Sequence, residues 1–130
     1  MDQRAQISVE FILLVAIVLA VVLVFAVVVS DQSEMNSIAT AAREGAANAT
    51  AQISILNASM TPVRVTNISM TNMTGGYNVT IVINLSNPGL SAAQKDIILG
   101  GAMQSINSTG YQSITNTVTT SKHNYTISVA

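Results

Sequence analysis

The chain has 130 residues, which is enough for one domain or for a long helix followed by one small domain. Charged residues make up 8% of the sequence and the net charge is −1, so there is no basic stripe for phosphates, and no nucleic-acid partner is expected. The sequence contains no cysteine, which excludes disulfides, thiolate nucleophiles and cysteine-ligated metal sites.

The first predicted element is a strongly apolar helix near the N-terminus. The run Phe11–Val29 contains 19 residues and no polar, charged, Gly or Pro side chain. As an α-helix it would be about 28 Å long, close to the ~30 Å hydrocarbon core of a bilayer. It is longer than the apolar region of a secretory signal peptide, and no A-x-A-like cleavage site follows it. The run therefore predicts a helix that spans a membrane or lies in an assembly without water.

Polar residues at fixed spacing precede this run. Gln6, Ser8 and Glu10 occupy alternate positions, and Leu14 completes the pattern Gln-x-Ser-x-Glu-x-x-x-Leu. Glu10 alone has a simpler interpretation, as an interfacial acid that the helix macrodipole stabilises by about 0.3–1 kcal/mol. The whole pattern is much rarer, below about 10⁻⁴ per start position at average residue usage. It therefore indicates a specific signal.

This pattern resembles the class III signal peptide of archaeal type IV pilins. The resemblance implies that a prepilin peptidase cuts between Ala5 and Gln6, so that residues 1–5 are a short leader and the apolar helix stays on the mature subunit. It also implies a homo-oligomeric filament built through the N-terminal helices, in which Glu10 pairs with the amine of a neighbour's Gln6. Extraction from the membrane would need an assembly ATPase and its membrane platform, because nothing in this chain predicts nucleotide binding.

The predicted helix continues beyond the apolar run. Apolar residues and alanines recur with a period of about 3.6, typical of one helical face. They are Met35, Ile38, Ala42, Ala46, Ala49, Ile53, Leu56 and Met60. We therefore expect one helix from about Ile7 to Leu56–Met60, and Pro62 ends it at the latest. Gly45 is either a bend or a tolerated helical glycine.

After Pro62 the period of the apolar pattern changes to two, as in half-buried strands. Apolar parity switches near Thr66–Asn67, which predicts a bulge. Turn signals rich in Gly separate the short runs. The predicted strands cover about 63–73, 77–86, 96–106, 111–119 and 124–130.

These elements predict an α+β fold. Residues 6–60 would form the long N-terminal helix, with 7–29 as the membrane or filament-core segment and 30–60 as an amphipathic half. Residues 62–130 would form a small, surface-exposed antiparallel sheet or sandwich whose apolar face packs on the helix stripe. Pilins share this architecture, so the periodicity and the resemblance lead to the same fold.

Glycosylation sequons are the second informative pattern. Asn-x-Ser/Thr occurs at eight of the eleven asparagines, where chance predicts roughly three. The sequons begin at Asn48, Asn57, Asn67, Asn72, Asn78, Asn84, Asn107 and Asn124. The excess indicates an extracytoplasmic surface with N-linked glycans, although strands rich in Ser, Thr and Asn also produce sequons freely. Strand parity turns Asn78, Asn84 and Asn124 away from the predicted core, whereas Asn48 and Asn57 lie on the helix and are poorer candidates.

No catalytic set is visible in the sequence. The single histidine, His123, has no second His or Cys at metal-ligand spacing, and no nucleophile elbow is present. Asp31 and Glu34 are the only acids within one helical turn of each other, where a solvated face explains them. We therefore expect no enzyme activity, no metal and no cofactor other than N-linked glycans.

The leading functional prediction is a structural, adhesive subunit of an archaeal type IV pilus-like filament, inserted in the cytoplasmic membrane before assembly and located on the cell surface afterwards. One alternative is an archaellin, the subunit of a swimming filament. Archaellins typically begin the mature helix with a Gly-rich GIGTLIVF-like segment, whereas this chain has QISVEFILLV. Another is a monomeric, membrane-anchored surface glycoprotein, which needs no leader motif.

Overall fold

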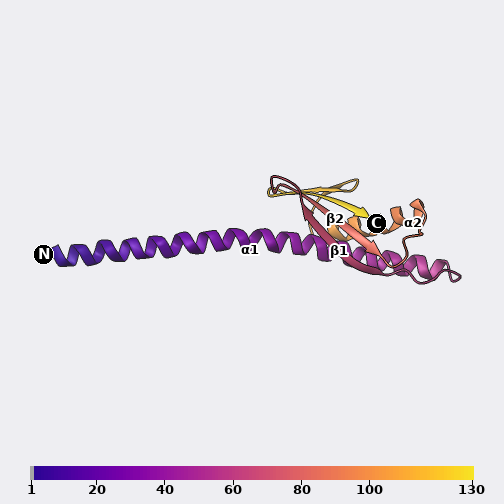
Figure 1. The fold of residues 1–130 in the computed structure, drawn as a ribbon, viewed down its shortest axis with the longest axis horizontal. Helices are drawn as coiled ribbons and strands as arrows, with labels where there is room; N and C mark the ends of the chain where they lie inside the picture. Colours follow the sequence, from indigo (N-terminus) through magenta and orange to yellow (C-terminus); the bar gives the residue numbers. More distant parts are fainter. Residues whose placement is uncertain (1) are drawn as a thin grey trace. The chain divides into compact units, whose positions relative to one another are not determined.

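A computed structural model of the chain describes residues 2–130. Its elements are α1 (Asp2–Leu56), β1 (Val65–Asn72), β2 (Asn78–Leu85), α2 (Ala92–Ser108), β3 (Ser113–Ile114), β4 (Thr117–Thr119) and β5 (Asn124–Val129) (Figure 1). The chain divides into two compact units, one ending at Met35 and one comprising Asn36–Ala130. The predicted α+β fold, a long apolar N-terminal helix followed by a small, mainly antiparallel sheet, is confirmed. The second unit includes the C-terminal part of α1, since the core of this unit contains residues from that part of the helix.

The C-terminal part of α1 buries small residues along the predicted stripe. The buried members are Ile38, Ala42, Ala46, Ala49 and Ile53, joined by Ala41 and Thr50. The prediction is wrong for Leu56, which is 81% exposed. Leu56 is the last residue of the helix, and the chain turns back beyond it, with the Val63 N–H donating to Ser54 Oγ. The segment after the helix therefore returns to Ser54 and leaves Leu56 exposed.

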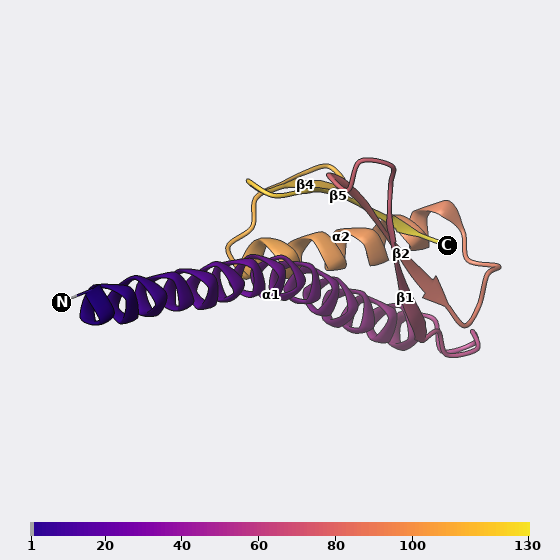
Figure 2. The same ribbon diagram turned by 60° about the vertical axis from the view of Figure 1, so that its left-hand side comes forward.

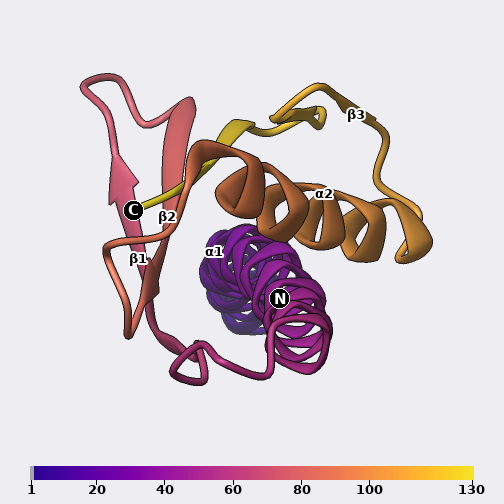
Figure 3. The same cartoon turned by 90° about the vertical axis from the view of Figure 1, so that its right-hand side faces the viewer.

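Glycine at position 45 allows a second helix to approach α1 closely. α1 continues through Gly45, and α2 crosses over this part of it (Figure 3). A Cβ at Gly45 would lie 2.6 Å from Ser105 Cβ, and a Cβ at Gly101 would lie 2.8 Å from Ala49 Cβ. Both distances are shorter than a van der Waals contact. At positions 45 and 101 the helix crossing therefore accommodates the hydrogen of a glycine and no larger side chain.

The predicted strand over 96–106 is wrong, because these residues belong to helix α2. Ser91 caps the helix in a capping box with Gln94: Gln94 N–H donates to Ser91 Oγ (3.3 Å), and the Ser91 N–H donates to Gln94 Oε1 (3.0 Å). The buried residues Ile98, Ala102, Met103 and Ile106 follow a helical spacing. Gly101 lies inside the helix, at its contact with α1.

The five strands form one sheet in the order β1-β2-β5-β4-β3. All neighbouring pairs are antiparallel except β2 and β5, which are parallel, so of the two predicted arrangements, sheet or sandwich, a single and mainly antiparallel sheet forms. The predicted bulge is confirmed by a register shift between Val65 and Asn67. The predicted strand over 111–119 is divided into β3 and β4, because Thr115 adopts a φ of 57° that breaks the extended backbone.

One face of the sheet forms the core with the helices. The core side chains of β2, β4 and β5 are Val79, Ile81, Ile83, Val118, Tyr125 and Ile127, each at most 1% exposed. Helix α2 contacts β5 and β3, and Figure 2 shows it running along this side of the sheet. The opposite face of β1, β2 and β5 is exposed or half-buried and carries mainly Asn, Ser and Thr, with Val82 among them.

Candidate functional site

The predicted processing and assembly motif lies on the first turns of α1. Gln6, Ser8 and Glu10 are exposed, and Leu14 is 59% exposed. Residues four apart lie on one side of a helix, so Gln6, Glu10 and Leu14 share a face. Ala5 lies within α1, whereas Met1 of the predicted leader lies outside the described residues. The predicted cut between Ala5 and Gln6 would therefore fall in the first turns of the helix.

The apolar side chains in the N-terminal half of α1 are exposed. Among residues 2–130, α1 is the one helix that is long and apolar enough to cross a membrane. None of its most apolar 18-residue window is buried. The large apolar side chains from Val9 to Val29 are between 36% and 66% exposed. A core helix of a water-soluble domain would cover at least one side. This surface is therefore suited to contact with lipid or with the apolar helices of other chains.

This apolar surface extends around the whole helix and carries a single charge. Between Arg4 and Asp31, Glu10 is the only ionisable residue. An unpaired carboxylate in an apolar medium is costly, so a partner of opposite charge would stabilise it strongly. Ala16 and Ala20 lie one turn apart and offer a small-xxx-small step at which a second helix could approach closely.

Most sequon asparagines of the second unit are exposed. Exposed members are Asn48, Asn57, Asn67, Asn72, Asn78 and Asn107, whereas Asn84 and Asn124 are half-buried. Asn78 and Asn84 alternate with the buried residues of β2, and Asn124 precedes the buried Tyr125 on β5, so all three side chains face away from the core. Asn67 on β1 is opposite Asn84, so four sequons gather on the outer face of β1, β2 and β5.

The sheet register places these four sequons in two pairs. Asn67 is opposite Asn84, and Asn78 is opposite Asn124. Asn84 Nδ2 donates to Ser69 Oγ at 3.0 Å, and Asn124 Nδ2 lies 3.5 Å from Asn78 Oδ1. The sequence did not predict this pairing, because the pairing depends on strands that are up to 46 residues apart.

The acidic residues and the histidine do not come together. Among residues 2–130, no group of three or more His, Cys, Asp or Glu side chains is arranged to hold a metal ion. His123 instead packs beside Tyr125, with 3.4 Å between its Nδ1 and the tyrosine hydroxyl. This contact ties the β4–β5 turn to the core.

The N-terminal segment matches the family model of the class III signal peptide over residues 3–29. The match covers Gln6, Ser8, Glu10 and Leu14, together with the exposed apolar run. Comparisons with curated proteins and with solved structures found no match. A class III signal peptide implies processing by a prepilin peptidase and assembly of a secreted filament. The chain therefore begins with a class III signal peptide, the N-terminal signal of type IV pilin-like proteins.

Proposed function

We propose that this chain is the structural subunit of an archaeal type IV pilus-like filament on the cell surface, with an adhesive role. One observation carries the proposal: the class III motif occupies the first turns of a helix whose large apolar side chains from Val9 to Val29 are exposed. A helix of this kind needs a water-free environment before and after assembly. The bilayer supplies the first environment, and a bundle of identical helices supplies the second.

Assembly in this proposal is driven by helix packing and polar pairing. The helix has already left water while the subunit waits in the membrane, so hydrophobic burial contributes little to the transfer. Cleavage before Gln6 would create an amine there, and Glu10 of a neighbouring subunit would pair with that amine. Work for extraction from the membrane would come from an external ATPase and its membrane platform. The role is structural and requires no catalytic residues and no cofactor.

The second unit would form the outer surface of the filament and carry N-linked glycans. Support comes from the outward direction of Asn78, Asn84 and Asn124 and from the exposure of Asn67 and Asn72. A glycan at an outward position leaves core packing undisturbed. The uncharged Asn, Ser and Thr face of the sheet is also a surface on which neutral sugars can form hydrogen bonds.

An archaellin role is the near alternative, and the QISVEFILLV start of the mature helix favours a pilin because it lacks the Gly-rich archaellin pattern. A monomeric membrane-anchored glycoprotein is the alternative from another class. Such an anchor would need a lipid-facing helix but no processing motif, so the motif favours a filament subunit.

Shearing of native cells tests the proposal. We expect the protein in sedimentable filaments, with Gln6 as the first residue by mass spectrometry and with an intact mass above that of the polypeptide. Protein that stays in the membrane fraction and retains residues 1–5 would support the monomeric anchor. Filaments whose loss stops swimming while attachment persists would support the archaellin role.

A further inference from the structure

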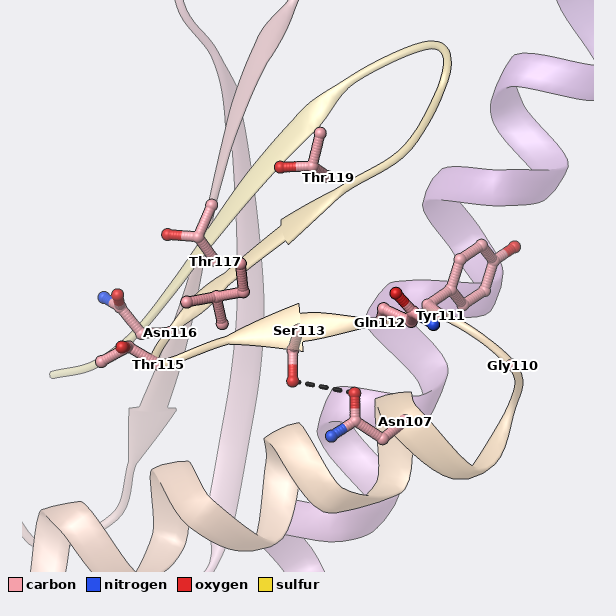
Figure 4. Close-up of a pocket in the computed structure, with 10 residues that line it drawn as sticks. Asn107, Gly110, Tyr111, Gln112, Ser113, Thr115, Asn116, Thr117 and Thr119 are labelled. Carbon is pink, nitrogen blue, oxygen red and sulfur yellow. Dashed lines mark hydrogen bonds between the residues drawn. The ribbon is translucent and has the colours of Figure 1, made fainter.

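A groove lies between the C-terminal end of α2 and the hairpin formed by β3 and β4 (Figure 4). Its volume is about 1050 Å³, the size of a site for several sugar rings or a drug-sized ligand. Its described lining consists of hydroxyl and amide side chains, the aromatic ring of Tyr111 and the aliphatic Ile114, and it contains no charged residue. This chemistry suits a neutral, hydroxyl-rich ligand.

A sequon lies in the wall of this groove. Asn107, the first residue of Asn107-Ser108-Thr109, lines the groove and is exposed. Its Oδ1 accepts a hydrogen bond from Ser113 Oγ at 2.8 Å, so the amide oxygen is held toward the hairpin. Figure 4 shows the nitrogen of this amide turned away from Ser113. Nδ2 is the atom to which an N-linked glycan attaches.

We propose that Asn107 carries an N-linked glycan whose first sugars lie in this groove. The inference rests on the proposed glycosylation of the second unit and names one site and its role. In the modification, the anomeric carbon of a glycosyl donor activated as a lipid phosphate ester forms a bond to Nδ2. The anomeric C–O bond to the phosphate breaks, and the amide loses one proton.

Attachment to the same chain explains how an open groove can be occupied. A shallow polar site binds a free sugar weakly, because the sugar loses translational freedom and both surfaces lose water. A sugar tethered at the rim has an effective concentration in the millimolar range or above. The exposed Gln112 and Thr115 supply hydrogen-bonding groups, and the half-buried Tyr111 supplies an aromatic surface for the C–H face of a sugar ring.

The glycan would connect α2 to the edge of the sheet. β3 contains two residues and β4 three, and β3 is the last strand at that edge. Short edge strands with few hydrogen bonds open more readily than a central strand. A glycan that bonds to the hairpin from Asn107 would slow this opening, so backbone amides of β4 would exchange their hydrogens more slowly.

Hydrogen exchange of the full chain, purified from its native host in detergent, tests the inference. We compare the native glycoprotein with Asn107→Asp, which keeps the oxygen that accepts from Ser113 but removes the glycosylated nitrogen. The control is Thr74→Ala, which removes the exposed sequon of Asn72 elsewhere on the surface. We expect the peptide covering 113–119 to exchange about tenfold faster in Asn107→Asp, as for the loss of one well-made hydrogen bond, and to be unchanged in Thr74→Ala.

The unglycosylated wild-type chain, made in a host without the transferase, should exchange like Asn107→Asp if the glycan causes the protection. A native Asn107 without a glycan overturns this inference, whereas glycans on other sequons would leave the proposed function standing. Equal exchange in the native and Asn107→Asp proteins also overturns it. The same acceleration in Thr74→Ala would show a general effect of glycans and would overturn the groove as its cause.

Discussion

The two halves of helix α1 differ in a way that hydrophobicity alone does not predict. The N-terminal half carries Val, Ile, Leu and Phe, yet its large apolar side chains are exposed. The C-terminal half is polar overall, yet Ala42 and Ala46 are fully buried and Gly45 admits a second helix. Burial within the subunit thus follows the pattern of small residues on one face. The more apolar half keeps its surface for an environment outside the subunit.

The contrast indicates separate tasks for the two halves. A helix that is apolar on all sides is suited to lipid or to a bundle of like helices, where packing and polar pairs decide association. A helix with one face of Ala and Gly is suited to one close, fixed partner, here α2. Substitutions in the first half should therefore affect assembly, and substitutions in the second should affect the stability of the subunit.

Glu10→Ala should have the largest effect on assembly. In the proposed filament it leaves the amine of a neighbour's Gln6 unpaired in an apolar core, at a cost of about 3–5 kcal/mol per contact by comparison with other broken buried pairs. We expect membrane-inserted subunits and no filaments by electron microscopy.

Glu44→Ala is the matched control, since Glu44 is an exposed acid on the other half of α1. It should assemble normally. Wild-type numbers of filaments from Glu10→Ala at equal expression would return Glu10 to the role of an interfacial acid. If the chain were only a membrane anchor, Glu10→Ala would aid membrane insertion, because it removes a charge from an apolar helix.

Gly45→Ala should destabilise the second unit by about 1–3 kcal/mol, the usual cost of overpacking, because the added carbon would be 2.6 Å from Ser105 Cβ. Thermal unfolding in detergent, followed by the tyrosine signal in near-UV circular dichroism, measures this change. Membrane insertion should persist, since the apolar half is untouched.

Gly100→Ala is the control for this prediction. It lies in the same α2 helix, beside Gly101, but an added Cβ there meets no atom within 4 Å. Alanine is favoured over glycine in a helix by about 0.5–1 kcal/mol, so Gly100→Ala should raise the unfolding temperature. Shifts of the same sign for Gly45→Ala and Gly100→Ala would contradict the tight crossing.

Ser91→Ala should have the smallest effect, a loss of about 1 kcal/mol, because it removes the hydroxyl that caps the first turn of α2. The same unfolding experiment measures it. Ser121→Ala, at an exposed position outside the helices and strands, should change the unfolding temperature by far less. If the two variants are equally stable, the capping box contributes little to the second unit.

The apolar pattern of the sequence predicts correctly those helices and strands in which apolar residues recur with a clear period. The stripe of α1 and the alternation in β2 and β5 gave the correct element types, because each buries one regular face. The prediction is wrong for helix α2, because it assigns 96–106 to a strand. The spacing Ser91-x-x-Gln94 is nevertheless a capping-box signal for the start of a helix.

The features that were not predictable depend on contacts between distant segments. Gly101 and Gly45 face each other where α1 and α2 cross, with no room for a Cβ at either position, and nothing near either glycine in the sequence indicates this contact. The pairing of Asn78 with Asn124 likewise depends on the parallel register of β2 and β5. For the signal peptide the situation is reversed, because the sequence of residues 3–29 identifies it without any contact between distant segments.

The position of β5 in the sheet sets a condition on how the protein matures. β5 is the last strand in chain order, yet it lies in the centre of the sheet, between β2 and β4. The β1–β2 hairpin and α2 are made earlier but cannot close the core until Tyr125 and Ile127 arrive. Because such long-range pairing is slow, the sheet is completed only after the whole chain has been made. In the proposed surface filament, that interval would leave the sequons on unfolded chain, accessible to a transferase, before the sheet forms.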